Sequence, residues 1–357
     1  MWKINLAIAL IIFLFALGLV GGVAAVVANG LAPMKAGEER KVEIRDGMGT
    51  AQIAELLEEE GIIRSARVFR YYVRFKGEGT RFQAGTYLLR PGMELDELIA
   101  KFNRGDVVQP EMIRFTIPEG WTVEQIAADL AAKGYVDEQK FLELANRPEA
   151  FAGTRADAVP DDGRIRYRLE GYLFPETYAM PEGISEEEII RRMLAELDRK
   201  LGGLPDGWEQ RLEELDLDFH RLLTVASIIE REVAVDEERP IVAGVIYNRL
   251  KAGMNLEVDA TVQYALGEQK ERLLYEDLDV DSPYNTYANP GMPPGPIANP
   301  GIRSIEAALY PEESRYLFYV TKKDGTQEHY FAETFAQHQA NIRKSNENQQ
   351  RAGGAAR

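Results

Sequence analysis

The sequence predicts an α+β protein with a single N-terminal transmembrane helix, a small βα module and a larger mixed α+β domain. Three observations predict this organisation: a long uncharged N-terminal run, a strand–turn–helix pattern that occurs three times, and a second region in which helical periods precede two short strand-like runs. The 357 residues suffice for two ordinary domains, and 45% of them are apolar, so the chain can bury a sizeable core.

The N-terminal run is uncharged from residue 4 to residue 34, and its apolar core extends from Leu6 to Ala28. At about 1.5 Å per residue, this core is long enough to cross a hydrocarbon layer of roughly 30 Å. A cleaved signal peptide is the alternative, but its apolar region usually has about 7–15 residues. We therefore expect residues 1–34 to be a membrane anchor. Lys3 favours a cytoplasmic N-terminus, which would leave the acidic remainder outside.

The strand–turn–helix pattern begins at Val42, at Tyr87 and at Ile113, and each copy passes through a glycine into an amphipathic helical period. Two copies fall within residues 40–108. Small modules of this kind resemble the LysM glycan-binding fold, and generic βα packing is the alternative. We expect residues 40–108 to form a LysM-like glycan-binding module.

The larger domain is expected over residues 109–341. Helical periodicity covers residues 185–201, 220–233 and 240–250. Six of the 17 prolines then fall between Pro283 and Pro300, which excludes a helix or a central strand there and predicts a shaped loop. Two strand-like runs follow, at 315–320 and 328–331, with a turn between them. The polar tail, residues 342–357, is expected to be disordered.

Charge and residue content exclude several classes of function. The formal charge is −16, so the chain repels nucleic acid, and a polymeric substrate would be gripped through neutral groups. The sequence has no cysteine, which excludes disulfides, thiolate metal sites and a cysteine nucleophile. The three histidines lack metal-ligand spacing, so we expect no metal and no cofactor.

The helical period at residues 220–233 carries two candidate acids, Glu230 and Glu232. On a helical wheel, both glutamates fall off the polar face and among apolar residues. An apolar setting raises the pKa of a carboxyl group and suits it to general acid catalysis. Periodicity alone does not choose between the two, and a solvated helix end with both glutamates near Arg231 is the alternative.

Several long motifs occur in one order along the chain. They are Leu169–Tyr178 (LEGYLFPETY), Ala226–Glu232 (ASIIERE), Asn248–Leu250 with Gly253-Met254, Asp259–Tyr264, Tyr284–Tyr287, Gly291–Ile297, Tyr316–Val320, and Phe331 to His338. Together they resemble the endolytic murein transglycosylases, and the resemblance covers roughly residues 1–341.

The resemblance implies a lyase that cleaves the bond between N-acetylmuramic acid and N-acetylglucosamine in nascent glycan strands, which ends strand elongation. It implies that the first glutamate of the A-S-I-x-E-x-E motif, Glu230, is catalytic. One carboxyl could serve twice, first protonating the glycosidic oxygen and then taking a proton from the muramic C6 hydroxyl, which yields a 1,6-anhydro end. It further implies an enzyme of the cytoplasmic membrane that faces outward and contacts peptidoglycan and wall synthases such as penicillin-binding proteins.

Other motif residues are candidates for substrate binding. Asn285, Thr286 and Tyr287 could donate hydrogen bonds to sugars, and Tyr284 could stack on a sugar face. Asp259 and Thr261 could orient the catalytic carboxyl, although Asp259 could instead cap a helix.

Two other functions remain open from the sequence. One is a lysozyme-type hydrolase that uses Glu230 with Asp259 as the second carboxylate. The other is a non-catalytic scaffold that binds peptidoglycan through its repeated modules.

Overall fold

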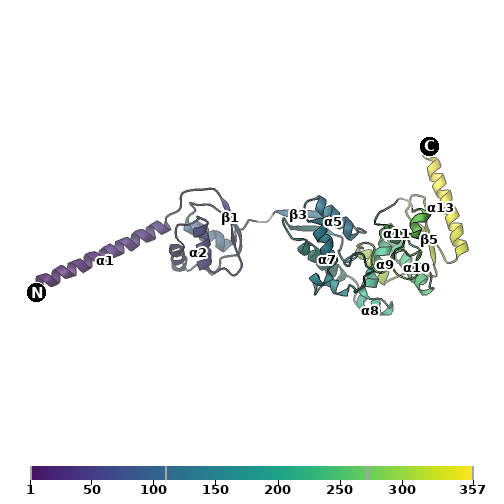
Figure 1. Cartoon of the computed structure of the whole chain (residues 1–357), viewed down its shortest axis with the longest axis horizontal. Coiled ribbons are helices and arrows are strands. Elements are labelled where there is room, and N and C mark those ends of the chain that lie inside the picture. The colour runs from purple at the N-terminus through teal and green to yellow at the C-terminus, as the bar shows by residue number, and fades with distance from the viewer. Residues whose placement is uncertain (1, 109–110, 271–272, 356–357) are drawn as a thin grey trace. The chain divides into compact units, whose positions relative to one another are not determined.

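The computed structural model describes residues 2–108, 111–270 and 273–355, and the chain divides into two compact units, Met1–Glu111 and Met112–Arg357 (Figure 1). Each unit has an apolar cluster made of its own residues.

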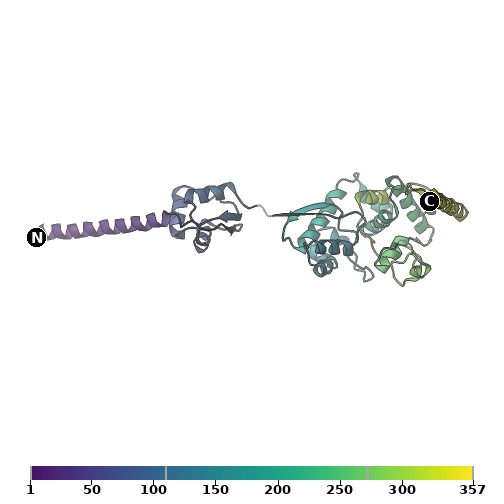
Figure 2. The ribbon, with the colours of Figure 1, turned by 90° about the horizontal axis from the view of Figure 1, so that it is seen from above.

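The N-terminal run forms one continuous helix, α1 (Trp2–Leu31), which both views show in purple (Figure 1, Figure 2). The 19 residues Phe13–Leu31 are long and apolar enough to cross a membrane. Large apolar side chains such as Phe15 and Val20 are more than half exposed. A helix whose large apolar side chains are mostly exposed fits the expected anchor.

The rest of the first unit is a small module with the order β1 (Arg40–Ile44), α2 (Thr50–Glu59), α3 (Ala66–Phe75), β2 (Gly85–Leu89) and α4 (Leu95–Arg104). The strands pair antiparallel, with Arg40 opposite Leu89 and Ile44 opposite Gly85. Alternate residues of β1 point into the core, where Val42 and Ile44 meet the buried rings of Phe69 and Phe102. Two of the three expected strand–turn–helix copies are therefore β1–α2 and β2–α4.

The third copy begins the second unit as β3 (Met112–Thr116) and α5 (Val123–Ala132). Strand β3 pairs antiparallel with β4 (Thr177–Pro181), which lies far along the chain. Around this pair the chain forms α6 (Glu138–Ala145), two short 3₁₀ helices at Pro148–Phe151 and Arg155–Ala158, α7 (Glu186–Leu201) and α8 (Trp208–Glu214). Helix α7 begins where periodicity predicted, because Ser185 caps it by accepting from the Glu188 N–H.

Helix α9 (Phe219–Glu232) is the central helix of this unit, and its residues Leu222–Ile229 are all buried. A helix that is buried on all sides needs neighbours on all sides. Three of these neighbours are α10 (Arg239–Lys251), α11 (Asp259–Leu266) and α12 (Ile302–Leu309). Short 3₁₀ helices occur at Asp236–Glu238 and Tyr275–Asp279.

The proline-rich segment between α11 and α12 contains no helix or strand from residue 280 to residue 301, as predicted. Its buried Asn299 donates to the Trp121 carbonyl and to Glu170, and accepts from the Leu173 N–H. Glu170 also accepts from the Tyr264 hydroxyl. This buried network ties the loop to α11 and to the turn that precedes β4.

The strands β5 (Phe318–Thr321) and β6 (His329–Ala332) form the predicted antiparallel hairpin. The expectation of a disordered tail is wrong for residues 342–355, because α13 (Phe335–Ala355) includes them and packs on this hairpin (Figure 1). Ser345 is buried and donates to the Thr321 carbonyl, and Asn348 donates to the Lys322 carbonyl. Polar side chains that bind carbonyls at the end of β5 and directly after it thus help to hold this helix on the hairpin.

Candidate active site

The two candidate glutamates lie two residues apart at the end of α9, so their side chains leave the helix on different sides. Each meets a different part of the second unit. The surroundings of the two carboxyl groups therefore differ.

Glu230 points toward the start of α12. Its Oε2 accepts from the Gly301 N–H at 3.0 Å and from the Ser304 hydroxyl at 2.8 Å. The Arg239 guanidinium lies 3.4 Å away, and the Glu230 side chain is only 7% exposed. The apolar setting predicted for Glu230 is therefore wrong, since a helix N-terminus, a hydroxyl and an arginine surround it. These contacts join the ends of α9, α10 and α12.

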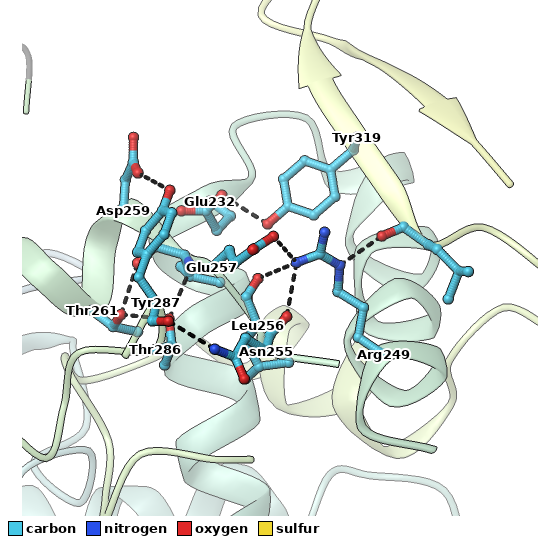
Figure 3. A network of polar contacts seen from close by, with 12 residues as sticks. Glu232, Arg249, Asn255, Leu256, Glu257, Asp259, Thr261, Thr286, Tyr287 and Tyr319 are labelled. Atoms are coloured by element: carbon cyan, nitrogen blue, oxygen red, sulfur yellow. Dashed lines mark hydrogen bonds and ion pairs between the residues drawn. The ribbon is translucent and has the colours of Figure 1, made fainter. Parts of the chain in front are cut away.

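Glu232 points into an open cleft of about 490 Å³. Its Oε2 accepts from the Tyr319 hydroxyl of β5 at 2.9 Å (Figure 3). Burial raises the pKa of the Glu232 carboxyl, and the negative charge of Asp259 adds to the rise, while the Tyr319 hydrogen bond opposes it. Charged and polar side chains such as Arg249 and Asp259 line the cleft around Glu232, so its setting is not the predicted apolar one either, although its pKa is raised.

Asp259 and Tyr287 line the same cleft. The Tyr287 hydroxyl donates to Asp259 Oδ1 at 2.6 Å (Figure 3). Asp259 is the first residue of α11, and Val258 takes the N-cap position without a side-chain cap. The alternative of Asp259 as a helix cap is therefore wrong, and its carboxylate is exposed to the cleft.

The other four predicted binding residues, Thr261, Tyr284, Asn285 and Thr286, are buried within the protein. Thr261 and Thr286 have hydroxyls 2.9 Å apart, and Thr286 accepts from the Val258 N–H. Asn285 donates to two carbonyls of its own loop, at Leu278 and Val280. In place of the expected sugar contacts, these side chains fix the loop and the start of α11, and so position Asp259 and Tyr287.

Tyr284 is buried against another ring and not open to a sugar face. Its ring centroid lies 4.8 Å from that of Tyr264, and its hydroxyl accepts from the Arg166 N–H at 3.3 Å. It anchors the proline-rich loop to α11.

Arg249 of α10 forms one wall of the cleft. Its guanidinium donates to the carbonyls of Asn255, Leu256 and Leu317 and to the Glu257 carboxylate (Figure 3). Glu257 has a positive φ of 53°, and the bonds of Arg249 to its carboxylate and to the two preceding carbonyls help to hold this conformation. Arg249 belongs to the Asn248–Leu250 motif, so the sequence pointed to this residue through the family resemblance.

His329 lies behind Tyr319, with the ring centroids 5.4 Å apart and the planes near perpendicular. Its Nδ1 is 2.7 Å from Glu238 Oε2, and its backbone N–H donates to Glu238 Oε1. This pair connects β6 to the start of α10 and supports the tyrosine that binds Glu232. Sequence reasoning missed Tyr319 and His329, which lie almost 90 and 100 residues beyond the glutamates.

In the described parts of the chain, no cluster of three or more histidine, cysteine or acidic side chains could hold a metal ion. His220 is instead held between the Tyr172 hydroxyl and the Pro294 carbonyl. His338 stacks on Phe318.

A partly buried carboxyl of raised pKa beside a second carboxylate, in an open cleft, defines a site suited to acid–base cleavage of glycosidic bonds. The chain matches the model of the YceG-like family over residues 42–344. It belongs to that family.

Relatives support the same assignment. The endolytic murein transglycosylase of Bacillus subtilis (strain 168) is 38% identical over 83% of this chain and 82% of its own length. That of Streptococcus pneumoniae serotype 2 (strain D39) is 32% identical over 88% of this chain, but the match covers 60% of the pneumococcal protein. The crystal structure of a YceG-like protein from Listeria monocytogenes is 38% identical, with a TM-score of 0.58 over 85% of this chain and 99% of that one.

Proposed function

We propose that this chain is an endolytic lytic transglycosylase of peptidoglycan. It would cleave the bond between N-acetylmuramic acid and N-acetylglucosamine within nascent strands, leave 1,6-anhydro ends and so end strand elongation. Membership of the YceG-like family and the names of the relatives support this function. The single observation that carries the chemistry is the placement of two carboxyl groups, Glu232 and Asp259, in one open cleft, where Tyr319 donates a hydrogen bond to Glu232.

Glu232 is the better candidate for the acid, although the family resemblance assigned that role to Glu230. A general acid needs a proton at working pH and access to the substrate. Glu232 lines the cleft, and burial favours its protonated form. Glu230 is not among the residues that line this cleft, and it is held by donors from Gly301, Ser304 and Arg239. We therefore assign Glu232 the chemistry and Glu230 the positioning of the end of α9.

In this mechanism the protonated Glu232 gives its proton to the glycosidic oxygen as the bond to the muramic anomeric carbon breaks. The carboxylate then takes the proton of the muramic C6 hydroxyl, whose oxygen bonds to the same anomeric carbon. The proton returns to Glu232 and no water is consumed, so the two-carboxylate scheme of hydrolases is not needed. Tyr319 orients the carboxyl. The exposed carboxylate of Asp259 can stabilise positive charge that develops on the sugar.

Product analysis tests both the reaction and the assignment. Purified peptidoglycan strands are digested with the wild type, Glu232→Gln and Glu230→Gln, and the products are analysed by mass. We expect anhydro ends from the wild type and a loss of about 10²–10⁴-fold in rate for Glu232→Gln. Reducing ends carrying one extra water would instead support the lysozyme-type hydrolase, with Asp259 as base.

The Glu230→Gln variant separates chemistry from positioning. We expect Glu230→Gln to lower the melting temperature as well as the rate. The amide has only one acceptor oxygen, so it cannot accept from Gly301, Ser304 and Arg239 as the carboxylate does. A Glu232→Gln variant that cleaves normally, beside an inactive Glu230→Gln variant that melts like the wild type, would return the catalytic role to Glu230. Unchanged glycan release by both variants would favour the non-catalytic scaffold.

The location of the enzyme is part of the proposal. The helix Phe13–Leu31 would hold the chain in the cytoplasmic membrane with both units outside, where nascent strands and wall synthases are found. The module at residues 40–108 would contact glycan in the manner of a LysM domain. Membrane fractionation with protease protection tests the orientation.

A further inference from the structure

One face of helix α3 differs in charge from the rest of the protein. Between Gly61 and Gly77 the sequence has five basic residues and no acidic one, although the whole chain carries −16. Arg67, Arg70 and Arg74 are exposed at helical spacing, and among the described residues none of the three takes part in an ion pair or a side-chain hydrogen bond. Three arginines without partners on one helix face are available to bind anions.

Two exposed aromatic rings lie on the same helix face. Tyr71 is 69% exposed and Phe75 is 86% exposed. The opposite face is buried through Val68, Phe69 and Val73. Since the core needs only that opposite face, the exposed rings add nothing to the packing of the module. Arginines flanking exposed aromatic rings are typical of a helix that lies in a membrane–water interface.

The first turns of α3 are attached to the end of α1. Arg64 donates to the carbonyls of Ala32 and Pro33, directly after α1. Val68 of α3 lies so close to Gly30 of α1 that a β-carbon added at Gly30 would fall 2.5 Å from its side chain. If α1 spans the membrane, these contacts hold α3 at the point where the chain leaves it.

We infer that the exposed face of α3 binds the anionic headgroup surface of the bilayer that α1 spans. Arg67, Arg70 and Arg74 would bind lipid phosphates, and Tyr71 and Phe75 would enter the interfacial layer. A hollow of about 600 Å³ lined in part by these arginines gives room for headgroups. The inference rests on the proposed membrane anchoring, and not on the proposed glycan cleavage.

The experiment uses the full chain in vesicles of phosphatidylcholine with about 30% phosphatidylglycerol. Because the protein has no cysteine, a fluorophore can be placed through Thr80→Cys, which lines the hollow, or through Glu43→Cys. Glu43 is exposed on β1, whose alternate residues Val42 and Ile44 face the core, so it lies across the module from α3. A quencher attached to lipid headgroups then reports how close each site is to the bilayer surface.

We expect quenching at position 80 to exceed quenching at position 43 by about twofold or more. The double variant Arg70→Glu/Arg74→Glu should lower quenching at position 80 to the level at position 43, and Arg70→Lys/Arg74→Lys should preserve it. The matched double variant Lys41→Glu/Arg45→Glu makes the same charge change on exposed residues elsewhere in the module and should leave it unchanged.

Three results would overturn the inference. One is equal quenching at both sites. Another is an equal loss of quenching at position 80 in the Arg70→Glu/Arg74→Glu and Lys41→Glu/Arg45→Glu variants. The third is a fluorophore at position 80 that responds to soluble anionic wall fragments but not to the lipid quencher. Flotation of the vesicles shows separately whether α1 anchors the chain, and cleavage of soluble glycan shows separately whether the proposed function fails.

Discussion

At Glu232, burial and the charge of Asp259 both favour the protonated carboxyl, while the Tyr319 hydroxyl favours the ionised form. The balance determines the pH at which the proposed acid loses its proton. Activity that needs the protonated form should fall as pH rises through this pKa. The pH profile of kcat/KM therefore reports directly on the side chains around Glu232.

Asp259→Asn removes a negative charge that raises the pKa of Glu232. We expect the alkaline limb of the kcat/KM profile to move to lower pH, by up to about one unit. The matched variant Tyr319→Phe removes a hydrogen bond that lowers the same pKa, so its alkaline limb should move to higher pH. Shifts of both variants in one direction would contradict this account of the site.

Glu170 predicts a pH dependence of stability. It is fully buried, and burial raises its pKa to about 8. The folded protein then holds a proton that the unfolded chain loses near pH 4.5, so this group's contribution to stability falls as pH rises from about 4.5 to 8. Glu170→Gln removes the titration, and its melting temperature should decline less than that of the wild type between pH 5 and 8. Parallel declines would show that Glu170 ionises normally.

Some of the site could be predicted from the residues alone. Helical spacing found two glutamates at the end of one helix, and the motifs identified Asp259 and Tyr287, which line the cleft. The choice between the glutamates could not be made from spacing, because it depends on Gly301 and Tyr319, contributed by distant segments. Thr261 and Thr286 carry polar groups like any sugar-binding residue, and only their burial shows that they bind each other.

At the scale of elements, the long periodic segments were predicted well and the C-terminal helix was not. Helices α7, α9 and α10 each fall within one residue of the predicted helical ranges. Helix α13 has no continuous apolar stripe. Part of its binding to the hairpin region comes from the polar side chains of Ser345 and Asn348. A pattern search for apolar periodicity cannot detect a helix that docks through polar side chains.

This docking makes α13 part of the cleft. Deleting residues 342–357 removes the hydrogen bond of Ser345 to Thr321 of β5, the strand that carries Tyr319, and the hydrogen bond of Asn348 to Lys322 directly after it. We expect the deletion to lower the melting temperature by several degrees and to reduce cleavage. Ser345→Ala should lose about 1 kcal/mol of stability, while Asn346→Ala on the exposed side of the helix should lose little. A fully active, equally stable deletion variant would contradict the role given to α13.

At the scale of the whole molecule, the two units have separate cores. The buried members of the larger apolar cluster lie between Phe115 and Leu309, and the apolar residues packed against them lie between Ile113 and Phe331. Residues 112–357 should therefore fold alone. We expect their melting temperature to lie within a few degrees of that of the second unit in the full chain. We also expect them to cleave soluble glycan to the same products. Glu232→Gln in this shorter chain is the control for activity. Aggregation of the shorter chain would show that the first unit contributes to its folding.

The contacts of Glu230 determine which amino-acid substitutions the protein tolerates at position 230. Aspartate at position 230 would withdraw the carboxyl by about 1.5 Å from the Gly301 N–H and the Ser304 hydroxyl, so length is the requirement there. Under the proposed mechanism, the requirement at position 232 is a transferable proton. The two glutamates would thus both resist substitution, but for different reasons: Glu230 for a structural role and Glu232 for the proposed catalytic role. Resistance to substitution would therefore mark both glutamates alike. The contacts of each side chain are what distinguish the proposed catalytic group from the structural one.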